Sequence, residues 1–320
     1  MSPQAPGLLG EIEAAARLVY QAMAPTPQYF WPLLSERAGC EVWVKQENHT
    51  PIGCFKLRGG IVYLHHLREA YPDLSGVVTA TRGNHGQSIA WAARRLGLGA
   101  VIIVPEGNNP EKNAAMQAHG AQLVVAGDDF QEAAEYAAGL AEERGLHMIR
   151  PFHPWLVQGV ASYALEFLRA APPLDSVYVP IGMGSGICGM IAARDALALP
   201  TRVVGVVAEG APAYADSFWA GRVMTTPSAT TLADGMACRV PDPVAVGVIA
   251  AGAAAVVTVS DEAILAAMRH YLTDTHNLAE GAGAAPLAAM LADPDRGGRV
   301  GLVLSGANAD RDLILKALNE

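Results

Sequence analysis

Residues 41–60 of this 320-residue chain, EVWVKQENHTPIGCFKLRGG, combine a strand pattern with the start of a helix. The first part of this stretch, Glu41–Lys45, is a short apolar run that predicts a buried strand, and from Lys56 the pattern predicts a helix that reaches Ala70. Lys56 therefore stands in the first turn of a helix. Because that end of a helix is positively polarised, a lysine held there in a pocket is favoured as the neutral amine, which reacts with aldehydes. A plain surface lysine is the simpler alternative.

Strand and helix patterns alternate along the rest of the chain. Strands are predicted at residues 41–45, 76–80, 100–104, 122–126, 177–180, 203–207, 256–259 and 300–304. Helices are predicted at residues 56–70, 86–96, 109–119, 130–144, 155–170, 186–198, 261–275 and 281–291. Near-continuous apolar strands such as Val101–Val104 are typical of parallel strands covered on both faces. The alternation predicts βαβ units in an α/β fold.

Composition excludes several classes of protein. Hydrophobic residues make up 51% and charged residues 17%, which argues against disorder, and the length suits two domains. The net charge of −9 argues against a nucleic-acid or anionic-membrane partner, because either would require clustered Lys and Arg. The four cysteines lack metal-ligand spacing and are expected to be reduced. The apolar segment Val244–Val259 is too short for a membrane span and predicts a buried helix running into a strand, so we expect a soluble, cytoplasmic protein.

Ligands in open α/β sheets bind beyond the carboxyl ends of the strands, so the loops that follow the predicted strands are the candidate binding segments. Thr81-Arg82-Gly83-Asn84-His85-Gly86-Gln87 joins a strand to a helix. Its two glycines allow backbone N–H groups to face an anion such as a carboxylate. An ordinary capped helix start explains the same pattern.

A second loop, Gly182-Met183-Gly184-Ser185-Gly186, follows the strand at 177–180 and suits a phosphate held on backbone N–H groups. Together with Gly189 it also matches the dinucleotide fingerprint G-x-G-x-x-G. Glu209 follows 20 residues after Gly189, where a ribose-binding acid is expected. A nicotinamide-dependent dehydrogenase is therefore the alternative from another class.

Five motifs in order resemble those of the serine/threonine dehydratase and serine racemase family, which are fold-type II pyridoxal-phosphate (PLP) enzymes. They are GCFKLRG at 53–59, TRGNHGQ at 81–87, GMGSG at 182–186, TLADG at 231–235 and LSGAN at 304–308. The resemblance runs from about Thr26 to Asn308. It implies two open, twisted, mostly parallel sheets with helices on both faces, like tryptophan synthase β. It also implies a large PLP-binding domain of residues 1–73 and 154–320, a small inserted domain of residues 74–153, and a homodimer.

The same resemblance implies the roles of the site residues. Lys56 carries pyridoxal 5′-phosphate as a Schiff base and acts as the catalytic base. Cofactor contacts are implied for Phe55, Lys56, Asn84, Gly182, Met183, Gly184, Ser185, Gly186, Glu280 and Ser305. Substrate contacts are implied for Thr81, Arg82, Gly83, Asn84 and His85. Ser305 has a second interpretation, as the N-cap of the last helix.

Three positions depart from the family pattern. Arg82 replaces the serine that is the second acid/base in the racemases, and a guanidinium is a poor proton acceptor. Cys54 replaces a small residue and is interpreted as packing. Val207 and Ala213 fall where some relatives have cation-binding acids, so we expect no metal site.

The resemblance thus implies a dehydratase that removes water and then ammonia from a β-hydroxy-α-amino acid such as threonine, serine or phenylserine. Serine racemase, threonine synthase and cysteine synthase are alternatives within the fold, and a catalytically silent binding protein is an alternative outside it. The aromatic segment Tyr29-Phe30-Trp31 suggests a pocket for a phenyl group. Core packing of the same three rings is the competing interpretation.

Overall fold

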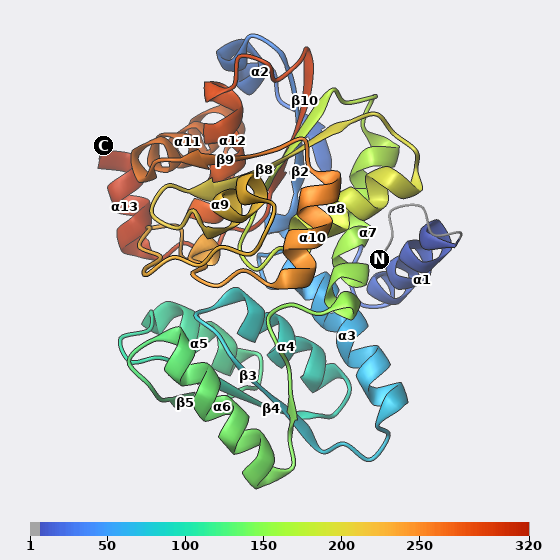
Figure 1. Cartoon of the computed structure of the whole chain (residues 1–320), viewed down its shortest axis with the longest axis vertical. Helices are drawn as coiled ribbons and strands as arrows, with labels where there is room; N and C mark the ends of the chain where they lie inside the picture. The colour runs from blue at the N-terminus through green and yellow to red at the C-terminus, as the bar shows by residue number, and fades with distance from the viewer. Residues whose placement is uncertain (1–6, 320) are drawn as a thin grey trace. The chain divides into compact units, whose positions relative to one another are not determined.

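The structure is a computed structural model that describes residues 7–319 (Figure 1). The chain divides into two compact units. The first comprises Met1–Phe55 and Val160–Glu320, and the second is Lys56–Gly159. The chain passes from the first unit to the second between Phe55 and Lys56, so the predicted catalytic lysine is the first residue of the second unit.

The first unit is built on a six-stranded sheet in the order β1-β2-β10-β7-β8-β9. All neighbouring strands are parallel except the edge pair of β1 and β2. The strands are β1 (Gln28–Phe30), β2 (Glu41–Gln46), β7 (Ser176–Pro180), β8 (Arg202–Ala208), β9 (Ala255–Val259) and β10 (Arg299–Leu304). Every residue of β7 and all but the first of β8 and β10 are buried, which confirms the prediction of parallel strands covered on both faces.

Helices of the first unit cover both faces of this sheet. On one face, a Cβ added at Gly301 would touch Phe167 of α7 (Pro154–Ala170), and one added at Gly205 would touch Ile187 of α8 (Ser185–Ala196). On the other face, Leu304 lies against Gly283 of α12 (Gly281–Ala292). Around them lie α1 (Leu8–Tyr20), α2 (Pro32–Ala38), α9 (Ala213–Ala220), α10 (Pro243–Gly252), α11 (Asp261–Thr275), α13 (Arg311–Asn319) and the 3₁₀ turns η1 (Glu47–His49) and η2 (Asp234–Met236).

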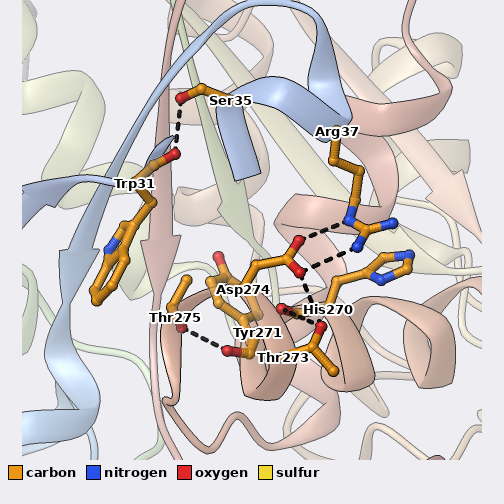
Figure 2. Close-up of polar contacts among 8 residues, drawn as sticks. All are labelled: Trp31, Ser35, Arg37, His270, Tyr271, Thr273, Asp274 and Thr275. Carbon is orange, nitrogen blue, oxygen red and sulfur yellow. Dashed lines mark hydrogen bonds and ion pairs between the residues drawn. The ribbon is translucent and has the colours of Figure 1, made fainter. Parts of the chain in front are cut away.

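An ion pair ties α2 to α11 (Figure 2). The Arg37 guanidinium donates to both carboxylate oxygens of Asp274, at 2.7 and 3.0 Å. This bidentate bond holds the pKa of Asp274 below its usual range. Trp31 precedes α2, and its carbonyl accepts the Ser35 hydroxyl at 2.8 Å, which fixes the chain where β1 turns into the helix.

The second unit is a four-stranded parallel sheet in the order β5-β4-β3-β6, with helices on both faces. Alternate strand residues separate the two cores: Val77, Ile102 and Val104 pack towards α3 and α4, whereas Val78 and Ile103 pack towards α6. The elements are α3 (Lys56–Ala70), β3 (Gly76–Ala80), α4 (Asn84–Arg95), β4 (Gly99–Val104), α5 (Pro110–Ala118), β5 (Gln122–Val125), α6 (Phe130–Arg144) and β6 (His147–Met148).

The boundaries of these units differ from the domain boundaries expected at 74 and 153. The helix α3 falls in the second unit because it packs along α4 there: a Cβ at Gly60 would stand 2.3 Å from the Ser88 hydroxyl oxygen. The domain assignment itself stays a prediction. The segment 244–259 forms a helix and then a strand, as expected, with α10 ending at Gly252 and β9 beginning at Ala255. The expected burial is wrong, because Val244 is 56% exposed and β9 is the edge strand of its sheet. Within residues 7–319, the helices all fall short of the length and apolar character that crossing a membrane demands.

Candidate active site

Lys56 is the first residue of α3, as predicted. The approach to it is fixed in the first unit: the Phe55 amide donates to the Ser305 carbonyl at 3.0 Å, and Cys54 forms a β-bridge with Gly306. Cys54 is fully buried, which agrees with a packing role. In the second unit, the Lys56 carbonyl accepts the Ser88 hydroxyl at 2.7 Å. The backbone on either side of the Phe55–Lys56 bond is therefore held by hydrogen bonds.

Three residues, 81–83, join the end of β3 to the start of α4. Thr81 is buried, and its hydroxyl oxygen accepts the Gly83 amide at 3.0 Å. Gly83 is the N-cap of α4, and a glycine has no side chain that could cap the helix. A Cβ at Gly86 would stand 2.4 Å from the Met116 sulfur and 2.6 Å from a Thr81 methyl carbon, so this position requires glycine.

His85 is the most perturbed ionisable group of this loop. Burial, with the Lys56 charge adding to it, lowers the pKa of His85 to about 3, so the imidazole is neutral near pH 7. Its Nε2 atom is buried and has no hydrogen-bond partner among the described residues. A buried polar atom without a partner is costly unless a ligand completes it. Asn84 beside it is also buried, whereas Arg82 is exposed.

The glycine loop lies in the first unit between β7 and α8. Gly184 is the N-cap of α8 with φ +96°, a conformation that favours glycine, and it offers no side-chain cap. A Cβ at Gly182 would stand 2.3 Å from the Gly235 carbonyl oxygen, in the TLADG segment. The loop therefore presents bare backbone at the positive end of a helix of 12 residues.

Ser305 and Glu280 lie together at the carboxyl end of β10. Both are buried, and the Glu280 amide donates to the Gly306 carbonyl at 3.0 Å. A Cβ at Gly306 would stand 2.6 Å from Glu280 Oε1. The alternative role of Ser305 as a helix N-cap is wrong, because α13 begins at Arg311 and Asp310 Oδ1 accepts the Leu313 amide at 2.7 Å.

Two neighbours of these loops carry no sequence motif. The Lys112 side chain of α5 packs on Gly83, where an added Cβ would stand 2.9 Å from its Cδ. The Tyr163 hydroxyl of α7 donates to the Gly186 carbonyl at 2.9 Å, and its ring meets that of Phe55 edge to face. Only the three-dimensional contacts identify these two residues.

Val207 and Ala213 stand where some relatives are expected to have cation-binding acids, and both side chains are fully buried. Val207 lies within β8, and Ala213 is the first residue of α9. In residues 7–319, no group of three or more His, Cys, Asp or Glu side chains could hold a metal ion. We predict that a chelator leaves both activity and Tm nearly unchanged. Assays before and after exhaustive dialysis against EDTA measure this, and a large loss restored by Mg²⁺ would contradict it.

Comparison with known proteins identifies the class of enzyme to which these loops belong. Residues 19–306 match the family described as pyridoxal-phosphate dependent enzyme, and the chain belongs to that family. Within it, the chain falls among the serine/threonine dehydratases and serine racemases, and its fold is that of fold-type II PLP enzymes. Its cofactor is PLP, and the family assignment removes the dehydrogenase alternative.

Individual relatives cover almost the whole chain. It is 33% identical over 314 residues to an L-threonine ammonia-lyase of Thermotoga maritima, covering 98% of this chain and 78% of the relative. It is 36% identical over 280 residues to an L-threonine ammonia-lyase of Geobacter sulfurreducens, covering 86% and 69%. Among solved structures, a threonine deaminase of Solanum lycopersicum superposes with a TM-score of 0.90 at 29% identity, covering 98% of this chain and 92% of that one. The structure of maize serine racemase superposes with a TM-score of 0.90 at 26% identity, covering 97% of this chain and 96% of the racemase chain.

The residues present fit PLP. The glycine loop provides uncapped amides and two positions where a Cβ would collide with its surroundings, which suits a phosphate held by backbone. Lys56 provides an amine at the start of a helix, and His85 provides a buried nitrogen without a partner in the described part of the chain. The glycine loop of the first unit thus suits the phosphate of the cofactor, and Lys56 and His85 of the second unit suit chemistry on an aldehyde and an amino acid.

Proposed function

We propose that this enzyme is an ammonia-lyase that converts a small β-hydroxy-α-amino acid, threonine or serine, into a 2-oxo acid and ammonia. The observation that carries the proposal is the similarity to an L-threonine ammonia-lyase over 98% of the chain. The Lys56 motif and both anion-binding loops lie inside the matched region. Water lost in the elimination returns when the product is hydrolysed, so the net change is the release of ammonia.

In this proposal PLP supplies the electron-withdrawing group that acidifies the α-carbon of the amino acid. Lys56 would carry the cofactor, and its free amine would take the α-proton of the substrate as a general base. The Thr81–His85 loop binds the substrate carboxylate through its amides, with neutral His85 adding a hydrogen bond.

The remaining residues hold the cofactor in place. Gly182–Gly186 would bind the phosphate, Asn84 would bond the ring hydroxyl, and Phe55 and Glu280 would border the ring. The Ser305 hydroxyl would bond the ring nitrogen. Because a neutral serine does not stabilise a protonated ring nitrogen, Ser305 would suit elimination of the β-hydroxyl.

The visible spectrum of the purified protein and a threonine assay test the proposal together. A yellow protein that bleaches on borohydride and releases 2-oxobutanoate and ammonia in equal amounts from threonine is the expected result. A colourless protein would contradict the role of Lys56. A yellow protein that is inactive on threonine and serine would support the assignment of the cofactor to Lys56. It would contradict the proposed substrate class.

Racemisation is the second activity that its structural relatives suggest, since maize serine racemase shares the fold. Arg82 is the residue that argues against it, because a racemase needs a second proton acceptor and a guanidinium stays protonated. We predict that L-serine gives pyruvate with negligible D-serine. Chiral chromatography of the reaction measures both products, and D-serine formed at a rate comparable to pyruvate would contradict the prediction. Arg82→Ser is the informative variant, because it restores the family residue.

Phenylserine is the second candidate substrate, and the exposure of two of the three rings in the segment Tyr29-Phe30-Trp31 argues against it. Tyr29 is 51% and Phe30 41% exposed on the edge strand β1. Phe30 pairs with Trp43, three residues before β2 ends at Gln46, so β1 leads away from the carboxyl edge where the candidate loops of this unit lie. This placement favours packing and surface roles over a phenyl pocket.

We therefore predict that Tyr29→Ala and Phe30→Ala leave the ratio of kcat/KM for phenylserine to that for threonine unchanged. One methylene in an apolar pocket is already worth about 10–200-fold in discrimination, so a ring that lines the pocket would alter the ratio clearly. Trp219→Ala is the matched control, since that ring is 70% exposed on α9. If Tyr29→Ala or Phe30→Ala lowers kcat/KM for phenylserine but not for threonine, the rings line the substrate pocket and the prediction is wrong.

A homodimer in the cytoplasm completes the proposal. Its support is the resemblance to the dehydratase and racemase family.

A further inference from the structure

The glycine loop is held from behind by a tyrosine that no motif marks. Tyr214 is the second residue of α9 and is 2% exposed. Its hydroxyl donates to the Met183 carbonyl at 2.9 Å and accepts the Asp242 amide at 3.1 Å. One buried oxygen therefore connects the middle of the loop to the start of α10.

The hydrogen bond to Met183 fixes the direction of the next amide. No peptide bond in the described chain is cis, so the Met183 carbonyl and the Gly184 N–H point in opposite directions. A hydroxyl that holds the carbonyl on the Tyr214 side therefore turns the Gly184 N–H to the other side. Burial, with smaller contributions from neighbouring groups, raises the pKa of Tyr214, so its hydroxyl keeps the proton that it donates.

The surroundings leave the loop no room to relax towards Tyr214. A Cβ at Gly184 would stand 3.2 Å from the Tyr214 hydroxyl oxygen and 2.8 Å from Ala245 Cβ in α10. The start of α10 is itself rigid, because Asp242 Oδ1 accepts the Val244 amide at 2.8 Å. The loop thus lies on a surface made by α9 and α10, and Tyr214 is its polar contact there.

We propose that Tyr214 is a positioning residue: it orients the Met183–Gly184 peptide and thereby sets the affinity of the glycine loop for the phosphate of the cofactor. The inference rests on the proposed binding of that phosphate by Gly182–Gly186. Tyr214 acts from behind the loop through Met183, and it has no contact with the reacting atoms in this proposal. Its effect is therefore confined to ligands that carry a phosphate.

The test compares PLP with pyridoxal, which has the same aldehyde and ring but no phosphate. Dissociation constants of both are measured on the full-length apoprotein for the wild type, Tyr214→Phe and Tyr271→Phe. Tyr271 is the matched control, because it is fully buried in α11 and its hydroxyl has no partner among the described residues (Figure 2). For Tyr214→Phe we expect PLP to bind about tenfold more weakly, the factor that corresponds to ~1.4 kcal/mol, with pyridoxal unchanged.

Each outcome has one meaning. Selective weakening of PLP by Tyr214→Phe, with no change in Tyr271→Phe, supports the inference. An equal loss for both ligands, or no loss, overturns it. A wild type that binds PLP no better than pyridoxal refutes the phosphate role of the loop, and hence that part of the proposed function.

A second measurement needs no variant, should Tyr214→Phe fail to fold. Saturating inorganic phosphate on the wild-type apoprotein is expected to slow hydrogen exchange in the loop at 182–187 and also at 240–245, because the Asp242 amide shares the Tyr214 hydroxyl. Slowing confined to the loop overturns the coupling. If hydrogen exchange slows in neither segment, the result contradicts phosphate binding by the glycine loop.

Discussion

Replacing Lys56 with alanine is expected to abolish turnover while leaving the chain folded. Loss of a general base alone lowers the rate by about 10²–10⁴-fold, and loss of the amine that carries the cofactor adds to this. Folding is expected to survive because Lys56 occupies the first turn of α3, where alanine is a good helix former. The measurements are kcat on threonine, the visible spectrum, and the mass of the borohydride-treated protein, which should show no retained cofactor.

Lys316→Ala is the control for this variant, because Lys316 is exposed on α13 and belongs to none of the candidate loops. It should keep the activity, colour and Tm of the wild type. A Lys56→Ala protein within tenfold of wild-type activity would remove Lys56 from the mechanism. Lost activity accompanied by an unfolded circular-dichroism spectrum would instead assign Lys56 a structural role, and the proposed chemistry would then lose its main support.

The sequence predicted the parts of the fold that local pattern determines. The helix at 56–70 has the predicted bounds, because the apolar spacing and the following Tyr71-Pro72 define both of its ends. The strand at 76–80 also matches, since five buried residues between two turns leave little choice. Lys56 is the first residue of this helix, and Thr81 directly follows this strand, so both family motifs lie at the ends of predicted elements.

The elements that were missed depend on their partners. The strand β1 has three residues and is extended because it pairs with β2, and Pro32 then starts α2 directly after it. Short elements of this kind have no periodicity of their own, so the aromatic run Tyr29-Phe30-Trp31 was interpreted by its chemistry alone. The edge position of β1 became visible only with the sheet order.

The candidate site divides in the same way. The glycine pattern identified Gly182 and Gly184, because backbone N–H groups at the start of a helix bind anions, and the resemblance to the dehydratase family identified Ser305. They could not identify Tyr214, whose role depends on a hydrogen bond to a carbonyl 31 residues away in the chain. A tyrosine in an apolar helix has the same local pattern whether its hydroxyl positions a loop or, like that of Tyr271, finds no partner in the described residues.

Gly182→Ala is expected to have the second large effect, on both stability and cofactor binding. The added Cβ would stand 2.3 Å from the Gly235 carbonyl oxygen. Both groups belong to the backbone, so no side-chain rotation relieves the contact and one of the two segments must move. Overpacking of this kind costs about 1–3 kcal/mol, which lowers Tm by several degrees. Movement of the glycine loop also misaligns its amides, so PLP affinity should fall by roughly tenfold or more.

Gly247→Ala is the matched control, because the same methyl group is added where no atom lies within 4 Å. Gly247 lies inside α10, where alanine is favoured over glycine by about 0.5–1 kcal/mol, so Tm should rise slightly and PLP affinity should not change. Thermal unfolding of the apoproteins separates the stability effect from the loss of ligand, and fluorescence titration gives the affinity. A Gly182→Ala protein with wild-type Tm and wild-type PLP affinity would show that the loop can move away from Gly235 without cost. The close approach of the two backbones would then have no part in holding the phosphate.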